Sequence, residues 1–390
     1  MLKPLVRAAD TIVSIAAREV RLVRTTHNAR TSSSARSGAS DGKEMASAAT
    51  MSDTAHRRSE MRGRALRMET VEGNIQSTPM HVLGVDAGGT KTVCLLADER
   101  ANVLSEARGG GANLHSSGEL EVEKVLHDVM EKAIGDRSIT PAAVCLGIAG
   151  VDREDEARTV RAIMRRIGYK SRVVVVNDAL IALAAGAGDA PGIVVIAGTG
   201  SIVYGRNGRD EAARAGGWGH IVGDEGSGYW IGREALAAVM RATDGRGPAT
   251  RLTEDVLAHF NITDTSRLPR IVYDREVPRM SVAALGPIVQ RASELGDAVA
   301  TRVLERASEE LVLAARSVAT KLEMRGDAFP FILAGGVFPV VPWLGYELAR
   351  RLVEVAPRSQ VRALEQEPAV GAVCLALAEA NGGLRIPRYK

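Results

Sequence analysis

Two short turns rich in glycine and hydroxyl residues occur along this chain, and they limit the folds open to it. The first is Asp86-Ala-Gly-Gly-Thr90, and the second is Gly198-Thr-Gly-Ser201. Each turn lies between two short apolar runs, which is the pattern of a strand, a tight turn and a second strand. Two such units at equivalent places in successive half-chains predict a duplicated α/β fold.

The apolar pattern around each turn predicts alternating strands and helices. We expect strands at His81–Asp86, Thr92–Ala97, Asn102–Ala107, Ala142–Ile148, Arg172–Val176, Gly192–Ala197, Ile202–Arg206 and Phe331–Leu333. We expect helices at Gly118–Ile134, Arg153–Ile167 and Ala179–Ala185, the second of them capped by Asp152. A cleft between the two half-chains would then hold the ligands.

Residues 1–79 differ in composition from the rest of the chain. They carry 13 Lys/Arg against 8 Asp/Glu and include a low-complexity stretch at Thr31–Ser40. Such a segment cannot bury enough apolar surface to offset its chain entropy, so we expect a disordered amino-terminal extension. A transit peptide at residues 1–24 is one alternative, although Asp10 and Glu19 count against it. A start at a later methionine is another.

Charge and cysteine content exclude several classes of function. The formal net charge is +3, and residues 1–79 alone carry a larger positive excess, so the remaining chain is slightly acidic and does not favour nucleic acid. No apolar run is long enough to span a membrane, and we expect a cytoplasmic protein. Cys94, Cys145 and Cys374 are far apart between apolar residues, so we expect buried thiols and no zinc or iron–sulfur site.

The first turn has the residues of a phosphate-binding element. Gly88 and Gly89 let backbone N–H groups approach phosphate oxygens, and Thr90 adds a hydroxyl donor. Asp86 ends the preceding strand and is placed to orient Mg²⁺ through water, since Mg²⁺ takes few carboxylates and keeps several waters. The turn is not a P-loop, because Lys91 comes one position late and a strand follows. Taken alone, the segment also fits a plain β-turn.

The second turn repeats these donors with Thr199 and Gly200. Two such turns at matching ends of two sheets predict a clamp on a triphosphate. A further strand ends in glycines at Leu333-Ala-Gly-Gly336, and Gly335 and Gly336 would let an adenine ring lie on the backbone. By itself this last element also fits an ordinary packing turn.

Asp178 is the candidate general base. It follows Arg172–Val176, a run rich in β-branched residues that predicts a buried strand. Ligands of α/β folds bind at the carboxyl ends of strands, and phosphoryl transfer needs a group that accepts the acceptor's proton. From these residues alone, a helix N-cap at Asn177-Asp178 is the favoured alternative.

The segment Gly216–Trp230 combines several glycines with Trp218, His220, Asp224 and Glu225. Carboxylates and exposed N–H groups bind sugar hydroxyls, and an indole can cover the apolar face of a sugar. We therefore expect this segment to line a sugar site. His220 has no cysteine or second histidine nearby, so we expect it to fix the loop by hydrogen bonds and not to bind zinc.

Taken in order, these motifs resemble those of the eukaryotic-type N-acetylglucosamine kinases within the BadF/BadG/BcrA/BcrD ATPase family. The resemblance spans about residues 82–382 and rests on Gly84–Thr90, Asn177-Asp178, Ala197–Ser201, Gly216–His220, Gly223–Ser227 and, more loosely, Leu333–Gly336. It implies an actin/hexokinase-like (ribonuclease H-like) α/β fold with duplicated domains and an interdomain cleft. The amino-terminal ATPase domain would be residues 80–190 and the carboxy-terminal one residues 191–390.

The resemblance also implies roles for single residues. It makes Asp178 the catalytic base, which decides against the cap, and it places Thr90 and Thr199 on ATP. The sugar would be held by Asn113, Asp178, Ser201, Gly217, Trp218, Gly219 and Asp224. The implied reaction transfers the γ-phosphate of ATP to the 6-hydroxyl of N-acetylglucosamine, with Mg²⁺. Residues 244–278 match poorly and receive no role.

Alternatives stay open for the acceptor and for the class of protein. Relatives in the family phosphorylate glucosamine or N-acetylmuramic acid, and no residue excludes these sugars. An ATPase activator of a radical dehydratase or reductase would need cysteines spaced to hold an iron–sulfur cluster, which this chain lacks. We expect an amino sugar and ATP as partners, with no nucleic acid and no membrane, and we leave a homodimer open.

Overall fold

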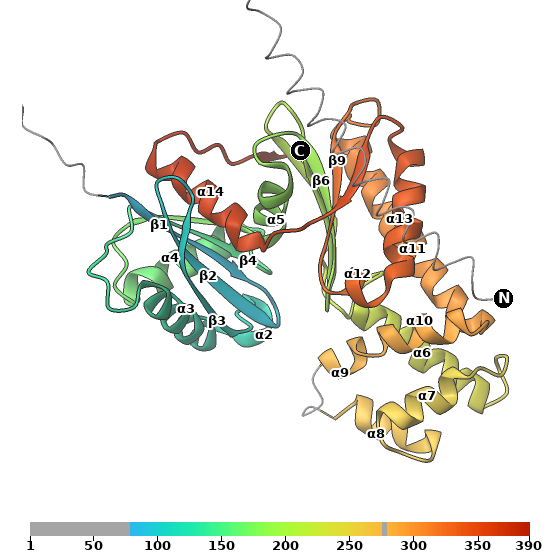
Figure 1. The fold of residues 1–390 in the computed structure, drawn as a ribbon. Helices are drawn as coiled ribbons and strands as arrows, with labels where there is room; N and C mark the ends of the chain where they lie inside the picture. The colour runs from blue at the N-terminus through green and yellow to red at the C-terminus, as the bar shows by residue number, and fades with distance from the viewer. Residues whose placement is uncertain (1–78, 275–278) are drawn as a thin grey trace, which may run out of the picture. The chain divides into compact units, whose positions relative to one another are not determined.

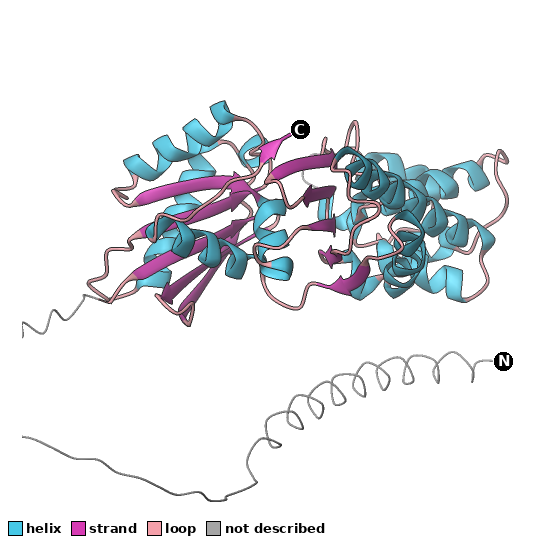
Figure 2. Cartoon of the chain, turned by 90° about the horizontal axis from the view of Figure 1, so that it is seen from above, coloured by secondary structure: helices cyan, strands magenta, loops and turns pink. Residues whose placement is uncertain are grey.

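The computed structural model describes residues 79–274 and 279–390, which form two β-sheets flanked by helices (Figures 1 and 2). The expected amino-terminal extension lies outside the described residues, apart from its last position, Pro79. The first sheet has the order β3-β2-β1-β4-β5. Its strands are β1 (His81–Ala87), β2 (Lys91–Asp98), β3 (Val103–Gly110), β4 (Ala143–Ile148) and β5 (Arg172–Asn177). The helices of this half are α2 (Leu114–Ser117), α3 (Glu119–Ile134), α4 (Glu154–Arg166) and α5 (Asp178–Ala187).

The second sheet has the order β10-β9-β6-β7-β8-β11. Its strands are β6 (Gly192–Ala197), β7 (Ser201–Arg206), β8 (Glu211–Gly216), β9 (Pro330–Ala334), β10 (Gln360–Ala363) and β11 (Arg388–Tyr389). Between β8 and β9 lie α6 (Gly228–Thr243), α7 (Leu252–His259), η1 (Thr265–Arg267), α8 (Leu268–Val272), α9 (Arg279–Ala283), α10 (Gly286–Glu294) and α11 (Ala298–Lys321). The remaining helices are α12 (Val337–Val340), α13 (Pro342–Val355) and α14 (Pro368–Ala380).

The two sheets repeat one topology. In each, three strands form an antiparallel meander, and two later strands extend the sheet in parallel from the meander's first strand. The first turn of each meander, between β1 and β2 and between β6 and β7, is one of the glycine–hydroxyl turns identified in the sequence. The duplicated actin/hexokinase-like fold class is therefore confirmed, and both halves belong to one compact unit of the chain. The boundaries at residues 80–190 and 191–390 remain a prediction.

The halves share part of their hydrophobic core. Helices α3 and α4 cover one face of the first sheet, and α5 and α14 cover the other. Helix α14 comes from the end of the chain, yet it packs against β1 and α5 (Figure 1). The cluster under α5 and α14 contains Val82 and Val174 from the first sheet and Val194 and Ile332 from the second. This common core fixes the two glycine turns on one scaffold.

Several predicted boundaries were wrong in detail. β3 continues through Gly110, so Gly109 and Gly110 are strand residues and only Gly111 onward is loop. Asp152 is not the cap of α4, because α4 begins at Glu154 with Arg153 as its N-cap. The backbone N–H groups of Asp152 and Arg153 instead donate to Oε2 of Glu156, at 2.7 and 2.8 Å.

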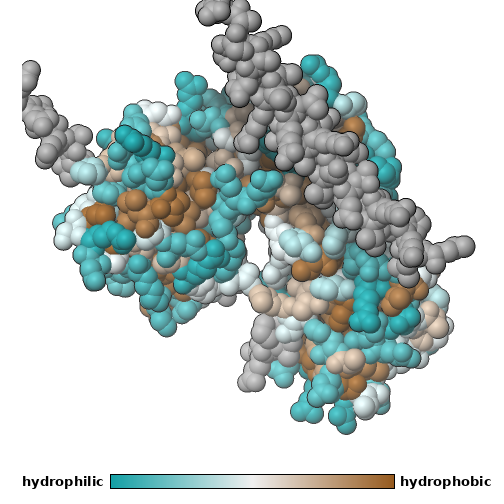
Figure 3. Space-filling model, in the orientation of Figure 1, coloured by the Kyte–Doolittle hydropathy of each residue, from teal (hydrophilic) through white to brown (hydrophobic). Residues whose placement is uncertain are grey.

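In the view of Figure 3, hydrophobic residues gather in patches that are surrounded by hydrophilic ones. Cys94 and Cys145 are buried as expected, whereas Cys374 is exposed on α14, so that prediction was wrong. In the described part of the chain, no helix combines the length and apolar character needed to cross a membrane.

Candidate active site

The β1–β2 turn holds the first predicted phosphate element. Asp86 lies at the end of β1 and is only 8% exposed. The backbone N–H of Gly88 donates to the carbonyl oxygen of Lys91 at 2.9 Å, which closes the turn. The Lys91 ammonium pairs with Glu367, just before α14, at 2.9 Å. The turn is thus tied both to its own strands and to the helix that returns from the carboxy-terminal half.

The loop after β3 packs directly on this turn. The backbone N–H of Ala112 donates to the carbonyl oxygen of Gly88 at 3.0 Å. A Cβ at Gly111 would lie 2.3 Å from the carbonyl oxygen of Gly89, so only glycine allows this approach. The contact brings the start of the Asn113 segment to the β1–β2 turn.

Asn177 and Asp178, at the end of β5 and the start of α5, have different roles. The side-chain oxygen of Asn177 accepts from the backbone N–H of Ala179 at 2.7 Å, so Asn177 is the N-cap of α5. Asp178 is the first residue of the helix, and its side chain keeps some contact with solvent. The cap function therefore belongs to its neighbour, and the carboxyl group of Asp178 is left at the carboxyl edge of the sheet.

Two carboxyl groups near this edge have raised pKa values. Burial, aided by the charge of Asp152, raises the pKa of Asp178 to about 6, although N–H groups at the start of α5 oppose the shift. Burial and the charge of Asp178 raise the pKa of Asp86 to about 7. The charge of Asp178 therefore reaches Asp86, which lies at the carboxyl end of β1 in the first sheet.

These donors suit a magnesium ion held mainly by water. Mg²⁺ binds proteins through one or two carboxylates plus waters and substrate phosphates, and it would also keep a buried carboxyl ionised. Asp86 beside the glycine turn fits that role. Among the described residues, no group of three or more His, Cys, Asp or Glu could hold a metal directly.

The β6–β7 turn holds the second phosphate element. The backbone N–H of Gly198 donates to the carbonyl oxygen of Gly200 at 2.8 Å, and that of Gly228, at the start of α6, donates to Gly198 at 2.9 Å. Gly335 has a φ of 107°, and a Cβ there would lie 2.3 Å from the carbonyl oxygen of Ala197. Only glycine fits this position, so the predicted adenosine element lies against the second turn.

The predicted sugar residues of the second half assemble around Asp224. This residue is buried, has a φ of 58°, and accepts hydrogen bonds from the backbone N–H groups of Ser201 and Gly219. Burial raises its pKa. The Ser201 hydroxyl donates to the carbonyl oxygen of Glu225 at 2.8 Å, and the N–H of Gly217 donates to that of Ser201 at 2.9 Å. Asp224 therefore fixes the glycine loop onto the start of β7.

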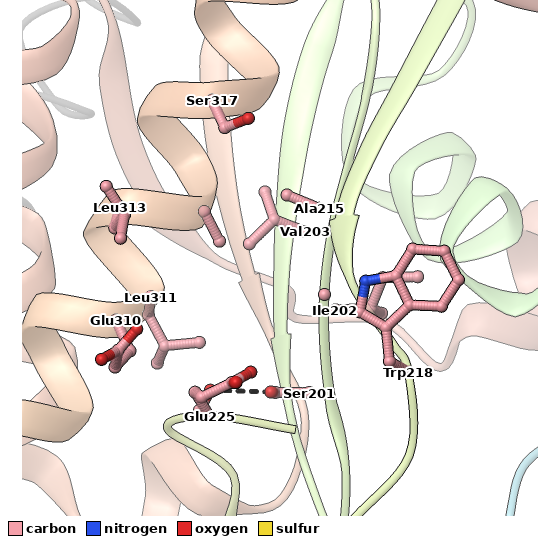
Figure 4. A pocket seen from close by; sticks show the side chains of 12 residues that line it. Ser201, Ile202, Val203, Ala215, Trp218, Glu225, Glu310, Leu311, Leu313 and Ser317 are labelled. Carbon is pink, nitrogen blue, oxygen red and sulfur yellow. Dashed lines mark hydrogen bonds between the residues drawn. The ribbon is translucent and has the colours of Figure 1, made fainter. Parts of the chain in front are cut away.

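Trp218 is available to a ligand. Its side chain is 60% exposed, and the guanidinium carbon of Arg214 lies 4.3 Å from its ring centroid. A pocket of about 280 Å³ lies beside it, between β7, β8 and α11. Figure 4 shows Trp218 near Ile202 and the Ser201–Glu225 hydrogen bond within this pocket. Of the predicted site residues, only Ser201, Trp218 and the loop's Glu225 and Gly216 line it.

His220 contacts residues of two helices, α6 and α9. Its ring packs edge-on against Tyr229, with the centroids 5.2 Å apart, and its Nδ1 lies 3.2 Å from the Arg279 guanidinium. Burial and the Arg279 charge lower the pKa of His220. The contacts agree with the predicted loop-fixing role.

The structure thus forms two groups from the predicted residues. The first contains Asp86, Gly88, Gly89, Thr90, Asn113 and Asp178, and the second contains Thr199, Gly200, Ser201, Gly217, Trp218, Gly219, Asp224, Gly335 and Gly336. An ion pair that sequence reasoning missed connects them, between Asp152 and Arg214 at 3.0 Å. No local pattern signals it, because its partners belong to different sheets.

A duplicated ATPase fold with a glycine turn in each half defines the class of this protein. The sequence matches the profile of the BadF/BadG/BcrA/BcrD ATPase family over residues 83–376. The chain therefore belongs to the BadF/BadG/BcrA/BcrD ATPase family, and the predicted membership is confirmed.

Individual relatives agree with this assignment. The chain is 37% identical over 304 residues to the N-acetylmuramic acid/N-acetylglucosamine kinase of Clostridium acetobutylicum, covering 77% of this chain and 99% of the relative. It is 32% identical to the N-acetyl-D-glucosamine kinase of Dictyostelium discoideum, covering 76% and 97%. The crystal structure of a candidate N-acetylglucosamine kinase from Chromobacterium violaceum matches with a TM-score of 0.64 and 28% identity, covering 76% and 99%.

Proposed function

We propose that this protein is an ATP-dependent amino-sugar kinase that transfers the γ-phosphate of ATP to the 6-hydroxyl of N-acetylglucosamine. The enzyme class follows from the ATPase family and from the sugar kinases to which the chain is similar. The acceptor and the position phosphorylated are our proposal.

The placement of Asp178 carries the proposal. Asn177 caps α5, which leaves the Asp178 carboxyl without the capping role, and the charge of Asp178 acts on Asp86 at the end of β1. Its raised pKa of about 6 leaves it mostly ionised at neutral pH, yet basic enough to accept a proton in the transition state. A base with these properties suits the deprotonation of a sugar hydroxyl.

The other residues divide into nucleotide and sugar contacts. Thr90, Thr199 and the glycines of the two turns would bind the phosphates, and Gly335 and Gly336 the adenosine. Asn113, Ser201, Gly217, Trp218, Gly219 and Asp224 would hold the sugar, with the indole against its apolar face. Mg²⁺, oriented by Asp86 through water, would neutralise phosphate charge when bound.

The proposed reaction transfers one phosphoryl group directly from ATP to the sugar. The carboxylate of Asp178 accepts the proton of the sugar 6-hydroxyl as its oxygen attacks the γ-phosphorus. The new bond joins that oxygen to phosphorus, and the bond from phosphorus to the β,γ-bridging oxygen breaks. ADP leaves with the electron pair, and the backbone donors of the turns hold the phosphates in position.

A panel of acceptors tests the substrate. With wild-type protein, ATP and Mg²⁺, we expect the highest kcat/KM with N-acetylglucosamine, with the product phosphorylated at position 6 by ³¹P–¹H NMR. N-acetylmuramic acid is the second candidate, because the Clostridium relative is named for both sugars. Equal and slow ADP release with and without each sugar would contradict the kinase proposal.

The pH profile tests the base. Asp178 must be ionised to accept a proton, and its pKa is raised above the usual value, so activity is present above that pKa and lost below it. We expect kcat, measured at saturating ATP, Mg²⁺ and sugar, to be half-maximal at about pH 6 and to fall about tenfold per pH unit below. A kcat that stays constant down to pH 4.5 would reject the role.

A further inference from the structure

The Arg214–Asp152 ion pair joins the two sheets beside the proposed site. Arg214 comes from β8 in the second sheet, and Asp152 from the loop between β4 and α4 in the first. Nη1 of Arg214 lies 3.0 Å from Oδ2 of Asp152, and the two side chains are 16% and 18% exposed. The pair is thus largely withdrawn from water, unlike exposed helix pairs such as Lys132–Asp128 on α3.

In the first half of the chain, Asp152 also contacts Asn177, which caps the helix that carries the proposed base. Oδ1 of Asp152 accepts a hydrogen bond from Nδ2 of Asn177 at 2.6 Å. The other side-chain atom of Asn177, Oδ1, accepts from the N–H of Ala179 and caps α5. Asp178 is the first residue of α5. Asn177 therefore contacts Asp152 of the ion pair directly and is also the residue next to the proposed base.

In the second half of the chain, Arg214 also contacts Trp218 in the proposed sugar loop. The Arg214 guanidinium stacks on Trp218, with its carbon 4.3 Å from the ring centroid. A cation and the face of an indole ring attract each other, and a stacked guanidinium also restricts the orientation of the ring. Direct contacts therefore run from Trp218 through Arg214, Asp152 and Asn177 to the start of α5.

Several charged or titratable groups act near the base. Asp86 on β1 and Asp152 are acidic, Tyr389 on β11 has its pKa raised to about 12 by burial and by Asp152, and Arg214 is cationic. The negative charge of Asp152 is one cause of the raised pKa of Asp178. Arg214 pairs with the other carboxylate oxygen of Asp152, Oδ2, and its positive charge offsets the negative one.

We propose that Arg214 and Asp152 are positioning residues for phosphoryl transfer, whose ion pair holds the base on α5 and the tryptophan of the sugar loop in a fixed relation across the two sheets. This inference rests on the proposed function. Neither residue needs to touch the reacting atoms. Their effect is on geometry and on the charge near the base.

Four variants and a control test the proposal in the full-length protein: R214M, R214K, D152N, the double variant R214M/D152N, and R209M. Arg209 belongs to the same β7–β8 hairpin but forms exposed ion pairs with Glu211 and Glu323. Each variant is measured for melting temperature, for KM of ATP and of sugar, and for kcat between pH 5 and pH 8.5.

We expect R214M to lower kcat by about 10- to 100-fold, because small displacements of reacting groups cost that much. Its KM for sugar should rise and its KM for ATP should stay within about twofold. The acid limb of kcat should move to higher pH in R214M, where the charge of Asp152 is no longer offset by Arg214, and to lower pH in D152N. The double variant should return the limb toward wild type, R214K should recover most of the rate, and R209M should match wild type.

A merely structural ion pair would change the melting temperature and leave kcat and the KM for sugar of the folded variants unchanged. A folded R214M with wild-type kcat and acid limb would overturn the proposal, as would shifts of R214M and D152N in the same direction. If R214M does not fold, R214K and D152N provide the same comparison. A wild-type protein with no sugar-dependent ADP release would instead reject the proposed function, and the inference with it.

Discussion

Replacing Asp178 by asparagine should lower kcat by about 10²- to 10⁴-fold while leaving ATP binding close to normal. Removal of a general base typically costs that much, because the proton of the attacking hydroxyl then has no acceptor. The amide has nearly the shape of the carboxyl, and Asn177 still caps α5, so the fold should be retained. Single-turnover phosphorylation of N-acetylglucosamine measures the loss, and calorimetric titration with an ATP analogue measures binding.

Asp189 provides a matched control for this experiment. It lies just beyond the other end of α5, and its side chain is 98% exposed. D189N removes the same charge from the neighbourhood of the same helix and should keep wild-type kinetics. If D178N keeps a kcat near that of D189N, Asp178 is not the base. The loss of the acid limb in D178N would further assign that limb to Asp178.

Replacing Asp224 by asparagine should raise the KM for the sugar by about 10- to 100-fold and change the KM for ATP little. The carboxylate accepts N–H groups from Ser201 and Gly219, and hydrogen bonds to charged groups contribute about 1.5–3 kcal/mol. Asparagine tolerates the positive φ of this position, so the backbone itself is not strained by the change. Steady-state kinetics with each substrate varied in turn provides the measurement.

Asp210 is the matched control for Asp224. It has a φ of 56° in the β7–β8 turn, close to the 58° of Asp224, but its side chain is about half exposed. D210N should leave both KM values unchanged. An unchanged sugar KM in a folded D224N would show that Asp224 does not hold the sugar loop, and equal effects of the two variants would indicate a general loss of stability.

The sequence predicted those parts of the fold where a local pattern is strong. The strands before and after both glycine turns were found because β-branched and apolar runs there are broken by glycine and hydroxyl residues. Cα partners such as Val85 with Cys94 and Ile196 with Ile202 confirm the hairpin at each turn. Duplication followed from these two turns alone.

Elements without a local pattern were missed. β8 reads Glu-Ala-Ala-Arg-Ala-Gly, which lacks β-branched residues, and it is a strand because it pairs with β7. The start of α6 overlaps the glycine-rich segment, so the sequence interpretation extended the loop through Trp230, which is in fact a buried helix residue. Tertiary pairing decided both cases.

The role of Asp152 was misassigned for a related reason. An aspartate just before a helix fits an N-cap, and only the fold shows that its carboxylate instead meets Asn177 and Arg214. Contacts between residues on different sheets depend on how the two halves pack. The candidate base could be singled out from its place after a buried strand and was chosen over an N-cap through the family resemblance, whereas the ion pair had no signal of either kind.

A crystal structure with a non-hydrolysable ATP analogue, Mg²⁺ and N-acetylglucosamine tests the central claim most directly. We expect the phosphates between the turns at Gly88-Gly89 and Gly198–Ser201, with the sugar 6-oxygen about 2.6–3.2 Å from a carboxyl oxygen of Asp178. A bound sugar whose 6-hydroxyl lies out of reach of that carboxyl group, with the Asp178 side chain directed elsewhere, would contradict the account.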